Sequence, residues 1–62
     1  MHAFNLNLMM ARSALRERRV SYAIDYTRRA LSLANRMRDR QRTALCLKIL
    51  NWLRADLRRL AA

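Results

Sequence analysis

Apolar residues recur along most of the chain at the three- and four-residue spacing of an amphipathic helix. From Val20 to Met37 they cover an arc of about 200° around the helix axis, and from Leu45 to Leu60 an arc of about 160°. The stripe from Phe4 to Glu17 is less regular. The chain contains 0 glycine and 0 proline residues, which disfavours hairpin turns. The pattern therefore predicts an all-α protein.

The helix ends have to be set by residues other than glycine. Ser21 and Asp39 are suited to capping helices that begin directly after them, and Asn35 tolerates the left-handed conformation that ends a helix. We therefore expect three helices, at about residues 4–17, 21–36 and 40–60, joined by very short links. The alternative is that the first two segments continue as one helix, which gives a two-helix hairpin.

The arc of the central segment is wider than one neighbouring helix covers, so we expect this helix to be packed on two sides in a small bundle. The chain has 62 residues, 1 cysteine and 1 histidine, so neither a disulfide nor a metal is available to stabilise it. We therefore expect a single domain, residues 1–62, that is completed by dimerisation.

Large apolar and aromatic side chains lie at the edges of the predicted stripes, where helix-to-helix interfaces often use such residues. Packing within one monomer is the alternative role. The candidate interface residues are Tyr22, Tyr26, Leu33, Leu45, Ile49, Trp52 and Leu53.

The chain is strongly basic, with 14 Lys+Arg against 4 Asp+Glu and a formal charge of +10. An acidic protein partner is favoured, and nucleic acid is a second candidate; GC-rich coding is the competing explanation for so much arginine. We expect helix-turn ion pairs between Asp25 and Arg29 and between Asp56 and Arg59. In an up-down-up arrangement, the ends of the first and third helices form one basic pole of Arg16, Arg18, Arg19, Arg58 and Arg59.

Catalytic and metal-binding groups are scarce. His2 lies at the chain end without another ligand type nearby, and Cys46 lies within an apolar stripe, where burial makes a thiol inert. The three serines have no histidine to activate them. We therefore expect no enzymatic activity, no cofactor and no metal.

The segment Ala23 to Leu33 resembles the second helix of a tetratricopeptide repeat, in which alanines allow two helices to pack closely. At the spacing of the repeat, Met10 and Ala11 match its first helix. The resemblance covers about 30 residues once, and implies a close antiparallel helix pair with a face left for a partner. The chain departs from the pattern at Asn7, Ala14, Arg18, Thr27 and Asn35.

The sequence predicts a non-catalytic helical protein that self-associates and binds or modulates another protein as an accessory regulator. Its small size suggests a phage or plasmid origin. The alternatives are a nucleic-acid-binding regulator that uses the arginine pole, and a membrane-active cationic peptide. No targeting signal is recognisable and the longest apolar runs have four residues, Leu8–Ala11 and Ala44–Leu47, so no transmembrane segment is expected. A cytoplasmic location is expected, because the cysteine is unpaired.

Overall fold

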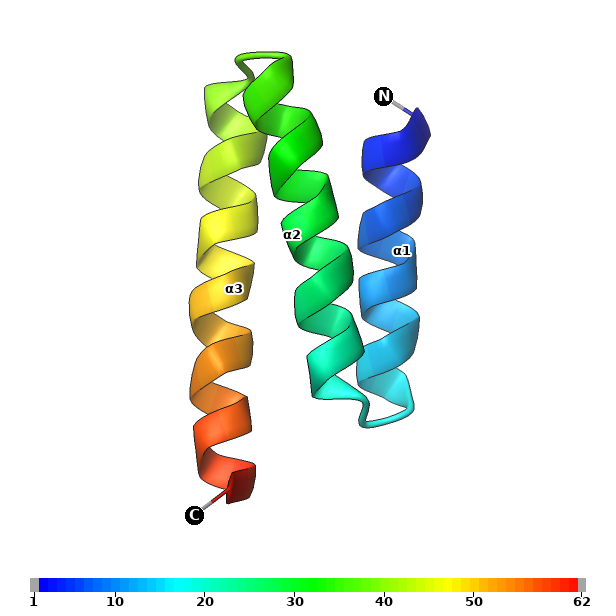
Figure 1. The fold of residues 1–62 in the computed structure, drawn as a ribbon, viewed down its shortest axis with the longest axis vertical. Helices are drawn as coiled ribbons and strands as arrows, with labels where there is room; N and C mark the ends of the chain where they lie inside the picture. The colour runs from blue at the N-terminus through cyan, green and yellow to red at the C-terminus, as the bar shows by residue number, and fades with distance from the viewer. Residues whose placement is uncertain (1, 62) are drawn as a thin grey trace.

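The computed structural model describes residues 2–61, with side chains up to residue 59. It consists of three consecutive antiparallel helices: α1 (His2–Arg16), α2 (Val20–Arg36) and α3 (Arg40–Ala61) (Figure 1). The predicted all-α fold with three helices is confirmed. The two-helix alternative is wrong, because the chain reverses direction between α1 and α2.

The central helix has a neighbour on each side. α1 and α3 both pack along α2, whereas no Cα atom of α1 lies within 8 Å of one in α3 in the described part of the chain. The Cα trace measures 37 × 18 × 12 Å along its principal axes. α3 is the longest helix, and its last turns extend past the link between α1 and α2 (Figure 1). The prediction that the central helix is packed on two sides is confirmed.

The link between α1 and α2 is built on Arg18, which has a left-handed backbone conformation with φ 59°. Its N–H donates to the carbonyl of Leu15 at 2.9 Å, and the N–H of Arg19 donates to the carbonyl of Ala14 at 2.8 Å. This pair of bonds satisfies carbonyls at the end of α1 in the Schellman pattern, in which glycine is the usual left-handed residue. Arginine takes that place here.

The link between α2 and α3 repeats this geometry at Arg38, whose φ is 53°. The N–H of Arg38 donates to the carbonyl of Asn35, and the N–H of Asp39 donates to the carbonyl of Ala34, both at 3.0 Å. The predicted helix end at residue 36 is confirmed, but the left-handed residue is Arg38 and not Asn35. Asn35 remains inside α2, because the buried face of this helix continues to Ala34 and the turn begins only after it.

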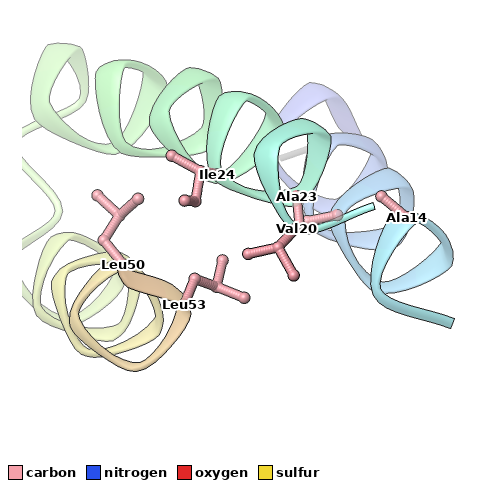
Figure 2. Packing of buried hydrophobic residues seen from close by; sticks show 7 residues of the cluster. Ala14, Val20, Ala23, Ile24, Leu50 and Leu53 are labelled. Carbon is pink, nitrogen blue, oxygen red and sulfur yellow. The ribbon is translucent and has the colours of Figure 1, made fainter. Parts of the chain in front are cut away.

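The start of α2 also differs from the prediction. The helix begins at Val20, after Arg19, and no side chain caps its first N–H groups. Val20 is buried in the same cluster as Leu53 of α3, which places it within the helix (Figure 2). Ser21 therefore lies in the first turn and is exposed, and does not cap the helix.

Asp39 caps α3 as predicted. One carboxylate oxygen accepts the backbone N–H of Arg42 at 3.0 Å, and the other accepts a guanidinium N–H of Arg42 at 2.6 Å. The pKa of Asp39 lies below its ordinary value because of these hydrogen bonds. The bond from the backbone N–H has the larger effect, and the bond from the guanidinium adds to it. The guanidinium of Arg42 also lies over the ring of Phe4, 5.4 Å from its centroid. The cap of α3 is thereby connected to the beginning of α1.

The core differs between the two helix pairs. Alanines line the contact of α1 with α2, where Ala14 and Ala23 belong to one buried cluster, and small side chains let two helices approach closely. Larger side chains fill the contact of α2 with α3, where Val20 and Ile24 lie opposite Leu50 and Leu53 (Figure 2). A second cluster, nearer the start of α1, contains Phe4, Ala30, Ala34 and Cys46.

Two polar side chains are fully buried in the middle of the protein. The hydroxyl of Thr27 donates to the carbonyl of Ala23 at 2.7 Å, which satisfies it without a partner from another helix. Cys46 is a free thiol, and its burial raises its pKa. It is therefore protonated at neutral pH.

The left-handed arginines predict that glycine at these positions stabilises the fold. Arg38→Gly should raise the free energy of unfolding by about 0.5–1 kcal/mol, because glycine has no Cβ to strain at positive φ. Thermal unfolding followed by circular dichroism should show a Tm higher by about 2–8 °C. Arg28→Gly is the matched control: it removes the same charge from an exposed position inside α2 and should lower stability by about 1 kcal/mol. A destabilisation of the same size in both variants would contradict this geometry.

The cap at Asp39 predicts a pH-dependent contribution to stability. Asp39→Ala should lower the free energy of unfolding at pH 7, and Asp39→Asn should lower it by less, because an amide oxygen still caps. The folded-state pKa lies below the unfolded value, so the contribution is present above about pH 4 and is lost as the pH falls through the folded-state pKa. Urea unfolding between pH 2 and 7 measures this. An unchanged difference between wild type and Asp39→Ala across that range would refute it.

Candidate functional site

An apolar groove runs between α1 and α3, on one side of α2. Its volume is about 330 Å³, and we call it the α1–α3 groove. α1 and α3 form its two walls, because each packs on α2 and their backbones do not approach each other. The lining residues are Leu8, Ala11, Arg12 and Leu15 of α1, and Ile49, Trp52 and Leu53 of α3.

The groove is closed towards the start of α1 and open towards the end of α3. Phe4 of α1 shares a buried cluster with Cys46 of α3 and lies beneath Arg42, so side chains bridge the two helices there. Further along, Leu53 is fully buried and Trp52 is 56% exposed. The widest exposed apolar surface of the groove therefore lies around the indole ring.

The charge in the groove has one sign. Arg12 is the charged residue among those that line it, and none of the lining residues is acidic. Asp56, one helical turn after Trp52, is half-buried and forms an ion pair with Arg59, as predicted. The groove therefore offers an apolar floor and a cationic wall.

The structure brings three of the predicted interface residues together in this groove: Ile49, Trp52 and Leu53. Leu53 is fully buried, and so belongs to the core beneath the groove. Leu45 is 45% exposed and lies one helical turn before Ile49, on the same side of α3. The lining residues on α1 were not predicted as a site, although Leu8, Arg12 and Leu15 have the spacing of one helix face.

Tyr22 and Tyr26 do not line the groove. They lie in a hollow between α1 and α2 that has a volume of about 340 Å³. We call it the α1–α2 hollow. Leu33 is half-buried and lies two helical turns after Tyr26, on the same side of α2. The predicted interface residues are therefore divided between two surfaces. The hollow is lined by Met10, Ser13, Ala14 and Glu17 of α1, by Arg19 of the link, and by Tyr22 and Tyr26 of α2.

Two arginines lie over these tyrosine rings. The guanidinium carbon of Arg19 lies 5.9 Å from the ring centroid of Tyr22, and that of Arg29 lies 5.2 Å from the ring centroid of Tyr26. Such distances are within the range of a cation–π interaction. Arg29 therefore does not form the predicted ion pair with Asp25, because the tyrosine ring one turn earlier holds its guanidinium.

The five arginines of the predicted pole are all exposed. Three of them follow or end α1, and two lie in the last turn of α3. Figure 1 shows these two helix ends at the same end of the molecule, separated by the start of α2. Arg19 pairs with Glu17 at 3.5 Å and Arg59 pairs with Asp56, so both of these charges are partly compensated.

No group of three or more His, Cys, Asp and Glu side chains that could hold a metal ion occurs among the described residues. In the same part of the chain, no helix combines the length and the apolar character needed to cross a membrane. Comparison with protein-family models, curated proteins and solved structures found no significant match. The resemblance to a tetratricopeptide helix pair therefore rests on the residues quoted for it.

Trp52 and Leu53 are neighbours in sequence, yet the structure predicts that substituting Leu53 lowers the free energy of unfolding much more than substituting Trp52. Leu53→Ala should lower the free energy of unfolding by about 2–5 kcal/mol, because it opens a cavity in the core. A domain of this size has about 3–9 kcal/mol in total, so this variant should lose about half of its stability. Trp52→Gln should change stability by less than about 1 kcal/mol. Urea titration by circular dichroism compares them, and equal losses would show that Trp52 belongs to the core.

Proposed function

We propose that this protein is a non-catalytic interaction protein whose α1–α3 groove binds an amphipathic helix of an acidic partner protein. The observation that carries the proposal is an apolar groove whose two walls do not meet, with Trp52 half exposed in it. A helix seated there would contact α1 and α3 together and add a fourth helix to the three of the chain. By covering that helix, the protein would act as an accessory regulator of its partner in the cytoplasm.

The chain exposes more surface than a compact monomer of its mass, which supports the binding of a partner. The chain exposes 4994 Å². A compact folded monomer of 7.4 kDa exposes about 4,200 Å². The excess of about 800 Å² equals the area that one protein contributes to an interface of standard size.

Charge favours an acidic partner over a second copy. The formal charge of the chain is +10, so two copies repel each other, whereas an acidic helix is attracted at long range. Arg12 in the groove wall offers a guanidinium to a carboxylate on the bound helix. Homodimerisation remains a prediction. Rising salt should strengthen the association of two copies of the chain, whereas it should weaken the binding of an acidic helix.

The dimensions of the groove set the length of the bound helix. The α1 residues that line the groove run from Leu8 to Leu15, so this wall is about 11 Å long. A helix of about 12–15 residues covers that length and extends beyond it. Apolar side chains at positions i, i+3 or i+4, and i+7 would face the floor, and acidic side chains would face Arg12 and the surrounding solvent.

Nucleic-acid binding by the arginine pole is the second candidate function. The ends of α1 and α3 lie at the same end of the molecule and bring five exposed cations together there, which favours this function.

A designed peptide tests the proposed groove. Its 14 residues would form an amphipathic helix with leucines on one face and glutamates on the other, and Trp52, the sole tryptophan, reports binding by a blue shift of its fluorescence. We expect saturable binding that weakens as salt rises, because the attraction between the charges is screened. A peptide with lysine in place of glutamate should not bind.

Matched variants locate the binding site. Trp52→Gln should weaken peptide binding at least tenfold by calorimetry, because it removes the largest exposed apolar side chain of the groove. Leu47→Gln is the control, since Leu47 is 49% exposed on α3 but does not line the groove. Equal effects of the two variants, or no binding of the acidic peptide, would overturn the proposal. A different outcome would assign the groove to a second copy of the chain: sedimentation would show a dimer that becomes tighter as salt rises, and the peptide would not bind to this dimer.

A further inference from the structure

The α1–α2 hollow has a different chemistry from the groove and lies on the opposite flank of α1. The groove uses Leu8, Ala11, Arg12 and Leu15 of this helix, whereas the hollow uses Met10, Ser13, Ala14 and Glu17. Its outer wall carries two tyrosine rings, and Tyr22 is 57% exposed. The hollow is therefore a surface separate from the groove. Its use does not rest on the proposed binding of a helix, but it deepens the second candidate function, because Arg18 and Arg19 also belong to the arginine pole.

Cationic and aromatic groups are combined at this hollow. Arg19 lies over Tyr22, and Arg29 lies over Tyr26. A guanidinium that lies over a ring still presents N–H groups at its edge, and these can bind a phosphate through two parallel hydrogen bonds. The contact with the ring favours this arginine conformation before a ligand arrives, which reduces the entropy lost on binding.

Further positive charge surrounds the same hollow. The exposed Arg18 precedes Arg19, and the start of α2, which no side chain caps, adds the positive end of a helix dipole. Glu17 is the acidic residue among those that line the hollow, and its carboxylate lies 3.5 Å from the Nε of Arg19. Both side chains of this pair are mostly exposed, so a phosphate can replace the carboxylate at little cost.

We infer that the α1–α2 hollow binds single-stranded nucleic acid, with an unpaired base stacked on Tyr22 and adjacent phosphates bound by Arg18 and Arg19. Proteins bind single-stranded nucleic acid with exposed aromatic rings flanked by cations, because every base presents a flat face and every nucleotide carries a phosphate. A duplex keeps its bases stacked inside and offers only phosphates. An acidic protein offers carboxylates without the flat aromatic faces.

Anisotropy of a fluorescein-labelled dT15 oligonucleotide tests this inference at about 50 mM salt, where phosphate contacts are strong. We expect the labelled dT15 to bind more tightly than a duplex of the same length, and poly-glutamate to displace it poorly. Tyr22→Leu should weaken binding about five- to hundredfold without a change in charge, since it removes one stacking surface. Glu17→Gln should strengthen binding, because it removes the competing carboxylate.

The control separates a site from general attraction by charge. Arg19→Gln and Arg54→Gln remove equal charge, but Arg54 lies on α3 and lines neither the hollow nor the groove. Arg19→Gln should weaken binding several times more than Arg54→Gln, and Trp52→Gln should leave it unchanged. The inference is overturned by equal effects of the two arginine variants, by wild-type binding of Tyr22→Leu, or by equal affinity for the duplex. Circular dichroism confirms that each variant is folded.

Discussion

The structure depends on the way α2 buries a wide apolar arc against two helices whose backbones do not approach each other. Small side chains such as Ala14 and Ala23 bring α1 close on one side, and Val20 and Ile24 receive the leucines of α3 on the other. Because α1 and α3 lie at different angles around α2, the space between them stays open as the groove. The outer flank of the α1–α2 contact forms the hollow. Both candidate surfaces thus follow from one packing arrangement.

Sequence patterns predicted the three helices and the cap of α3, whereas the cap assigned to Ser21 was wrong. The wide arc of the central segment indicated two neighbours for α2, and Asp39 was recognised because an aspartate favours an N-cap wherever the helix packs. The left-handed residues Arg18 and Arg38 were not recognised, since arginine has no preference for positive φ. Their positions are set by where the buried faces of α1 and α2 end.

The candidate surfaces were predicted only in part, because they depend on which side of α2 each neighbour occupies. The α3 wall of the groove follows from the regular stripe that contains Ile49 and Trp52, whereas the irregular stripe of α1 does not indicate its facing residues. Tyr22 and Tyr26 were placed at the edge of the central arc, but periodicity does not show which flank they share with α1. The stacking of Arg19 depends on side-chain conformation, which residue spacing does not encode.

The two links also determine how this chain can diverge over evolutionary time. Each reverses the chain through backbone hydrogen bonds and one left-handed residue, so neither link requires a particular side chain at that residue. Substitutions at Arg18 and Arg38 then change stability in small steps while the direction of the helices is kept. Homologues should therefore be recognised by the spacing of their buried alanines and leucines, because the fold itself constrains these positions more than the turn residues.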